Sequence, residues 1–107
     1  MKKLTPRETE VTGDEARIRW LAAEVLAEVG VEKDSGGWET LYRDPADGRY
    51  WLKRFPQGER QGGGAPVLKY ILLTDQEIKE RFVPPDQWKA ETERFYRERG
   101  IKFNPPQ

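Results

Sequence analysis

The turn at residues 44–48, Asp-Pro-Ala-Asp-Gly, is the feature that most constrains the fold of this 107-residue chain. Proline presets one turn dihedral, aspartate accepts hydrogen bonds from nearby backbone N–H groups, and glycine takes the positive φ that reverses the chain. Aromatic-rich runs with alternating side chains flank this turn at residues 38–43 and 49–55. The pattern predicts a β-hairpin with apolar groups on both faces.

A helical pattern precedes the hairpin. Thr12 and Glu15 have the spacing of a capping box, in which each side chain satisfies a free backbone N–H group. Apolar residues then recur on one helical face from Ile18 to Val29. Gly30 has the residue type of a left-handed helix stop. The sequence therefore predicts one helix that ends at Gly30.

The region after the hairpin predicts a third strand and C-terminal helices. Residues 67–73 are apolar on both sides, which favours an interior position in the sheet. Thr74 and Glu77 form a second capping-box pattern, and Pro84-Pro85 would end the helix that it opens. A further helical stretch is expected from Asp86 to about residue 99.

Together these elements predict an α+β fold. It comprises an N-terminal helix, a small antiparallel sheet of about three strands with a β-hairpin, and one or two C-terminal helices. We expect residues 1–107 to form one domain, because a chain of this length supports one modest core. Residues 1–12 and 101–107 are expected to be extended or loosely ordered.

The composition of the chain limits which functional groups it can use. The chain contains no cysteine and no histidine, which removes thiolate sites, the commonest metal ligand and the commonest general base. We therefore expect no catalytic residue, no metal site, no cofactor and no enzymatic activity. No apolar run approaches the roughly 20 residues that span a membrane, so a cytoplasmic location is expected. Abundant Arg, Glu and Pro with few Ser and Asn resemble the composition of a heat-adapted bacterial protein.

Two other function classes remain open from the residues alone. The basic and aromatic side chains of the hairpin resemble a surface that binds single-stranded nucleic acid, although 19 basic and 19 acidic residues cancel overall. A pair of carboxylates could also support acid–base catalysis, but no pair is singled out. The glycine triplet at 62–64 lacks the Gly-Lys-Ser/Thr ending and following helix of a phosphate-binding loop.

The chain resembles the immunity protein 27 family over about residues 8–75. The resemblance rests on Gly37-Trp38-Glu39-Thr40-Leu41-Tyr42-Arg43-Asp44-Pro45, Asp47-Gly48-Arg49-Tyr50-Trp51, Pro56-Gln57, Gly62-Gly63-Gly64, Pro66 and Leu68. Glu8-Thr9-Glu10-Val11, Gly13 and Arg17-Ile18-Arg19-Trp20-Leu21 fit it as well. It implies a small, non-catalytic α+β protein that neutralises a toxin of a bacterial polymorphic toxin system.

The resemblance and the residue types suggest two sets of site residues. An immunity protein acts by occluding its toxin, which requires large anchors and complementary charges. The expected partner is a cognate protein toxin, with the chain as a monomer or homodimer. The candidate contact residues are Arg49, Tyr50, Trp51, Arg54, Gln61, Gly62, Gly63 and Gly64. The candidate structural residues are Trp38, Tyr42, Asp44, Pro45, Asp47, Gly48 and Pro66.

Overall fold

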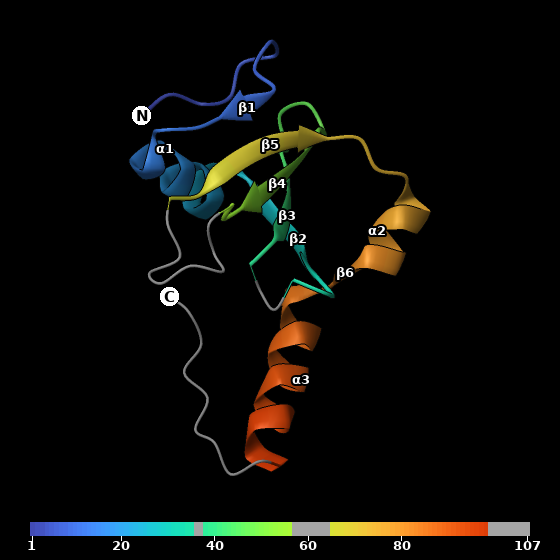
Figure 1. Ribbon diagram of the computed structural model, residues 1–107. Helices are drawn as coiled ribbons and strands as arrows, with labels where there is room; N and C mark the ends of the chain where they lie inside the picture. Colours follow the sequence, from blue (N-terminus) through green and yellow to red (C-terminus); the bar gives the residue numbers. More distant parts are fainter. Residues whose placement is uncertain (36–37, 57–64, 99–107) are drawn as a thin grey trace.

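Six strands form one antiparallel sheet in the computed structural model, which describes residues 1–35, 38–56 and 65–98 (Figure 1). Their order across the sheet is β1-β5-β4-β3-β2-β6. The α+β class is as expected, but the prediction of about three strands is wrong, because three further strands escaped the sequence pattern. The strands are β1 (Glu10–Val11), β2 (Ala27–Glu32), β3 (Thr40–Arg43), β4 (Tyr50–Arg54), β5 (Val67–Ile71) and β6 (Phe82–Val83).

The hairpin of β3 and β4 forms as its turn sequence predicts. The Asp44 N–H donates to the Arg49 carbonyl at 2.8 Å, and the Gly48 N–H donates to the Asp44 carbonyl at 2.7 Å. Gly48 has a φ of 78°. Carboxylate oxygens of Asp44 and Asp47 accept from the N–H groups of Ala46 and Arg49, both at 2.9 Å. The two aspartates and the glycine of the turn thus have the roles that their chemistry indicates.

The predicted N-terminal helix is shorter than expected. It comprises α1 (Glu15–Trp20) and a π-helical continuation, η1 (Leu21–Val25). Its N-cap is Asp14, whose carboxylate accepts from the Arg17 N–H at 3.1 Å, and the expected Thr12 cap is therefore wrong. Residues 27–32 form β2 instead of a last helical turn, and β2 pairs with both β3 and β6. Sheet pairing on two sides outweighs the local helical period here.

Gly30 does not end a helix, which corrects the expected left-handed stop. Among the described glycines only Gly13 and Gly48 have a positive φ. At Gly30 an added Cβ would lie 2.8 Å from the Val83 carbonyl oxygen and 3.1 Å from Phe82 Cβ. Glycine at this position therefore allows the β6 backbone to approach β2 closely.

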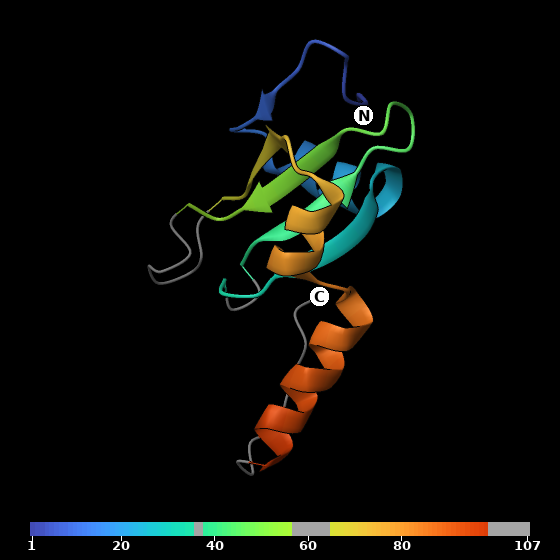
Figure 2. The ribbon, with the colours of Figure 1, turned by 90° about the vertical axis from the view of Figure 1, so that its right-hand side faces the viewer.

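The C-terminal elements follow the predicted order. The Thr74–Glu77 capping box is confirmed, and it opens α2 (Asp75–Arg81). The helix ends before Pro84, because residues 82–83 form β6 at the edge of the sheet. The second of the predicted C-terminal helices, α3 (Pro85–Glu98), projects away from the sheet (Figures 1 and 2).

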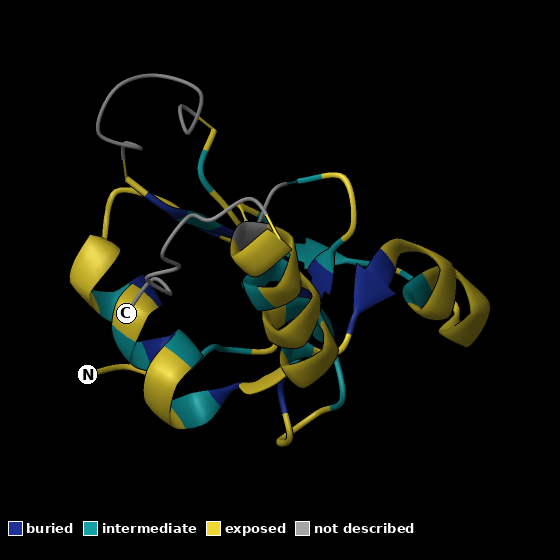
Figure 3. Cartoon of the chain, turned by 90° about the horizontal axis from the view of Figure 1, so that it is seen from below, coloured by how far each residue is buried: buried dark blue, intermediate teal, exposed yellow. Residues whose placement is uncertain are grey.

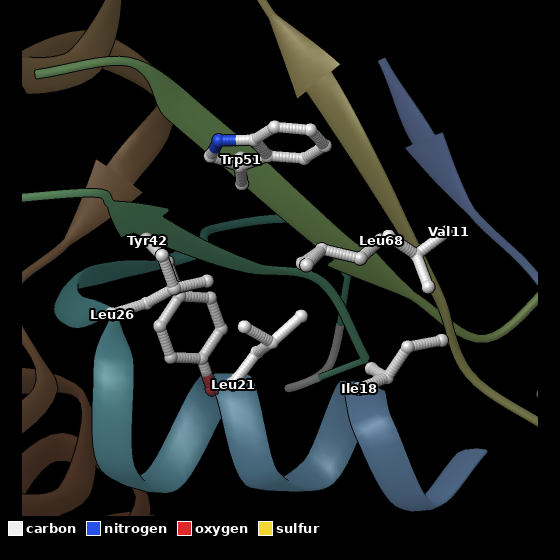
Figure 4. Close-up of a cluster of buried hydrophobic side chains, with 7 residues drawn as sticks. All are labelled: Val11, Ile18, Leu21, Leu26, Tyr42, Trp51 and Leu68. Carbon is white, nitrogen blue, oxygen red and sulfur yellow. The ribbon is translucent and has the colours of Figure 1, made fainter. Parts of the chain in front are cut away.

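The two faces of the sheet carry separate hydrophobic clusters. On one face, Ile18 and Leu21 of the N-terminal helix point toward strand residues (Figure 4). The buried members of this cluster are Val11, Ile18, Leu21, Leu26, Tyr42, Trp51 and Leu68. On the other face, α2 covers a smaller cluster built on Leu41, Leu52 and Phe82 (Figure 2). Helices on both faces explain why β3 and β4 are apolar on both sides.

We expect Gly30→Ala to destabilise the protein by about 1–3 kcal/mol, because the new methyl group must displace the β6 backbone. Urea denaturation followed by circular dichroism measures this loss. Glu28→Ala, at an exposed position of the same strand, is the control and should stay within about 0.5 kcal/mol of wild type. Equal stability of the Gly30→Ala and Glu28→Ala proteins would contradict the close approach.

Candidate functional site

Arg49 joins the hairpin to the N-terminal segment. Its Nη1 donates to the Glu8 carbonyl at 2.8 Å and its Nη2 to the Thr5 carbonyl at 2.9 Å. Its Nε donates to the Asp47 carboxylate at 2.7 Å. The guanidinium also lies over the Trp51 ring, 4.9 Å from its centroid. This geometry directs the charge of Arg49 toward the protein's own backbone and rings.

Arg17 of α1 holds the same segment from the other side. Its two Nη atoms donate to the two carboxylate oxygens of Glu8, each at 2.8 Å. Its Nε and Nη2 donate to the carbonyls of Lys2 and Lys3, both at 2.9 Å. We call residues 2–9, with Arg17 and Arg49, the N-terminal clip. Residues 1–12, expected to be extended or loosely held, are thus tied to the sheet and contribute β1.

The hydrogen bonds from Arg17 lower the pKa of Glu8 to about 2, against an opposing contribution from burial. A charge-assisted, bidentate pair favours the ionised carboxylate over the protonated one. The pair is mostly shielded, with 13% of the Arg17 side chain and 24% of the Glu8 side chain exposed. Glu8 therefore remains ionised throughout the neutral range.

Trp51, a candidate contact residue, lies in the interior. It is 0% exposed and packs edge-on against Tyr70, with ring centroids 5.9 Å apart. Its indole Nε1 is the buried side-chain polar atom that lacks a hydrogen-bond partner among the described residues. Trp51 supports the sheet beneath Arg49 and reaches no external surface in this structure.

The other candidate contact residues are spread over different parts of the molecule. Tyr50 is half-buried and packs against the smaller cluster on the α2 side. Arg54 is nearly half exposed at the end of β4, where it pairs with Glu39 at 3.0 Å. Gln61, Gly62, Gly63 and Gly64 lie outside the described residues.

The candidate structural residues divide into buried and exposed ones. Tyr42, Asp44 and Pro66 are buried, Gly48 is half-buried, and Pro45 and Asp47 are exposed in the turn. Burial, with the nearby charge of Glu28, raises the pKa of Tyr42 to about 12. Trp38 is exposed as well, to 45%, and it is the large apolar side chain of this set that is open to solvent.

Lys53 is directed inward along the hairpin. Its Nζ lies 5.6 Å from the Tyr42 ring centroid and 5.8 Å from the Phe55 ring centroid. Burial lowers the pKa of Lys53, and the charge of Arg19 contributes in the same direction while that of Glu28 opposes it. The cation is thus partly covered by rings of the protein itself.

A surface hollow of about 360 Å³ lies at the end of the hairpin that is remote from its turn. Trp38 and Phe55 meet there edge to face, with centroids 5.4 Å apart and planes at 74°. The Arg54–Glu39 ion pair lies on its wall. We call this site the Trp38 hollow. Its lining residues are Glu32, Asp34, Ser35, Trp38, Glu39, Arg54, Phe55 and Pro56.

A second hollow of about 720 Å³ runs along α3 beside the end of β2. Trp88, Thr92 and Phe95 line it at the helical spacing that the sequence indicates. Figure 3 shows α3 mostly exposed, with half-buried residues along one side. Phe95 is 47% exposed.

Sequence patterns missed four members of these sites. Glu8 and Arg17 stand nine positions apart, a spacing that matches no local pairing rule, and they meet only when β1 joins the sheet. Phe55 and Glu39 lie within the predicted strands at residues 49–55 and 38–43, where antiparallel pairing across the hairpin could have placed them near Trp38 and Arg54. Within the described ranges, no cluster of three or more acidic side chains has metal-binding geometry. The described helices include none long and apolar enough to cross a membrane.

These features define a small α+β protein built on one antiparallel sheet, with an aromatic hollow at one end of its central strands. The chain belongs to the immunity protein 27 family, whose sequence profile matches residues 7–72, more than half of its length. The match includes β1 to β5 and ends before α2, β6 and α3. No curated protein and no solved structure shows significant similarity to the chain.

Arg49→Lys should destabilise the protein by about 2 kcal/mol, because lysine keeps the charge but cannot reproduce the three hydrogen-bonding directions of the guanidinium. Urea denaturation measures the loss, and amide hydrogen exchange of residues 5–9 should accelerate. Arg19→Lys changes an exposed pair with Glu15 and should leave both readouts unchanged. Unchanged amide hydrogen exchange of residues 5–9 in the Arg49→Lys protein would show that Arg49 does not hold the N-terminal segment.

The Glu8–Arg17 pair predicts a defined acid dependence. Since the pKa of Glu8 falls from its usual 4.5 to about 2 on folding, its stabilisation is complete above about pH 5 and is lost as the pH falls toward 2. At neutral pH we expect the free energy of unfolding of wild type to exceed that of the Glu8→Gln protein by about 1–2 kcal/mol, after allowance for solvent screening.

Urea denaturation between pH 2 and pH 7 tests this dependence, since the difference between wild type and Glu8→Gln should shrink on acidification. Glu15→Gln, which changes the exposed pair with Arg19, should differ little from wild type throughout. A Glu8→Gln difference that is independent of pH would exclude the pair as its source.

Proposed function

We propose that this protein binds and neutralises a cognate protein toxin of a bacterial polymorphic toxin system, without catalysing a reaction. Membership of the immunity protein 27 family supports the general role. The absence of cysteine supports action in a reducing compartment, the cytoplasm. The proposed contact surface is the Trp38 hollow and its rim.

The choice of this surface rests on one observation: Trp38 is exposed at the end of the β3–β4 pair that is remote from its turn. Tryptophan, tyrosine and arginine are the residue types that most often dominate binding energy. At this site Trp38 is 45% exposed, whereas Trp51 is fully buried. Arg54 adds a charged group to the rim, and it is the described candidate contact residue with the most exposed position.

The surroundings of Trp38 support a preformed surface. The backbone N–H of Trp38 donates to the Ser35 carbonyl at 3.2 Å, and the backbone N–H of Glu39 donates to Ser35 Oγ at 3.2 Å. The ring packs against Phe55, at the end of β4. A large anchor that is already ordered loses less entropy on binding. The glycine triplet at 62–64 lies outside the described residues and is proposed as a further contact.

The same contacts argue against the nucleic-acid alternative. A strand of nucleic acid requires free cations beside stacking rings. Here Arg49 is bonded to carbonyls and Asp47, Lys53 is half-buried, and Arg54 is paired with Glu39. The carboxylates of the hollow also single out no acid–base pair, since Glu39 is held by Arg54 and Asp34 is exposed.

Co-expression of this chain with the products of adjacent genes tests the proposal. One neighbouring product should inhibit growth when expressed alone, and this chain should restore growth and form a stable complex in size-exclusion chromatography. The elution volume also distinguishes a monomer from a homodimer in that complex. Failure of every toxic neighbour to bind this chain would refute the proposed function.

In the complex, we expect Trp38→Ala to weaken affinity by about 2 kcal/mol, roughly 30-fold, because it removes a central anchor. Leu72→Ala is a matched control. Leu72 is 80% exposed and follows β5 at the opposite end of the β4–β5 pair, so its loss should change affinity by less than about 0.5 kcal/mol. Isothermal titration calorimetry gives both values, and circular dichroism verifies folding. Equal affinities would place the interface elsewhere.

A further inference from the structure

We propose that the Trp38 hollow receives an arginine side chain of the partner protein. This inference rests on the proposed function and specifies the chemistry that the toxin presents. It follows from an aromatic wall, from two carboxylates that form no ion pair among the described residues, and from a turn whose hydrogen bonds hold one of them in place.

The aromatic wall favours a flat cation. Trp38 is nearly half exposed while its edge-to-face contact with Phe55 fixes its position. Tryptophan is the best aromatic partner for a cation, and a guanidinium can stack on its face as well as attract it electrostatically. The hollow, at about 360 Å³, has room for one side chain.

Among the described residues that line the hollow, negative charges outnumber positive ones. Three carboxylates line it, and Arg54 pairs with the one that belongs to Glu39. Glu32 and Asp34 form no ion pair within the part of the chain that the structure describes. Two negative charges beside an exposed indole repel a phosphate or an acidic side chain and attract a cation.

The turn that follows β2 holds the Glu32 carboxylate and the backbone of Asp34. Glu32 Oε1 accepts from the Asp34 N–H at 3.2 Å, and the Glu32 carbonyl accepts from Ser35 Oγ at 2.9 Å. The Glu32 N–H donates to the Glu39 carbonyl at 3.0 Å, which joins the turn to the start of β3. These contacts bring Glu32, Asp34 and Trp38 to one site before a partner arrives. A planar guanidinium can then stack on the ring while it donates to a carboxylate.

Titration of the isolated protein with N-acetyl-arginine amide, followed by NMR of the indole N–H groups, tests the inference without a toxin. Trp38→Phe assigns the Trp38 signal. N-acetyl-citrulline amide has a similar shape but no charge, so it is the matched control ligand. We expect arginine amide to shift the Trp38 signal in a saturable manner and citrulline amide to shift it far less.

Two variants test the carboxylates. Glu32→Gln combined with Asp34→Asn should weaken arginine amide binding about two- to fivefold, the range expected for exposed charge pairs. Glu24→Gln, at an exposed position in η1, should leave binding unchanged. Equal shifts with citrulline amide, no shift at Trp38, or binding that the double variant does not weaken would each overturn the inference.

The outcome is separable from the proposed function. A toxin complex that forms while arginine amide fails to bind would refute the arginine site alone. Absence of any toxin complex would refute the proposed function, whatever the ligand titration shows.

Discussion

The structure depends above all on the guanidinium of Arg49. Its three donor atoms connect the hairpin turn at Asp47 with the N-terminal carbonyls of Thr5 and Glu8. Its flat face covers the ring of Trp51, at the centre of the sheet. With 15% of its side chain exposed, the guanidinium is largely shielded from water, so its donors need partners within the protein. Loss of one contact weakens the attachment of β1 and the packing of the aromatic residues beneath it.

These contacts place some basic and aromatic side chains of the hairpin inside the protein and leave others on its surface. Cationic and aromatic side chains of the hairpin look equivalent in the sequence, but most of them serve the fold. Arg49 and Trp51 are internal, and Lys53 is half-buried among rings. Trp38 and Arg54, at the strand ends away from the turn, remain accessible. The proposed contact surface is therefore small and lies beside the turn that follows β2.

The predictions from sequence succeeded where a structure depends on neighbouring residues. The hairpin turn and the Thr74–Glu77 capping box are confirmed, because their hydrogen bonds join groups within a few positions of one another. The extension of the first helix to Gly30 was wrong, because the apolar residues at 25–31 also fit a strand. Pairing with β3 and β6 decided between these two conformations, and the local pattern of residues 25–31 does not show these pairings.

The sequence by itself determined the α+β class, the hairpin and the capped start of α2, since turn dihedrals and side-chain caps are local interactions. The tertiary structure alone decided the six-stranded order and the attachment of the N-terminal segment. It also decided which tryptophan is exposed. Trp51 is covered because β5 and the N-terminal clip pack beside it, whereas Trp38 precedes β3 at the margin of the sheet. The burial of a side chain depends on which other segments pack against it, and the residue type alone does not determine this.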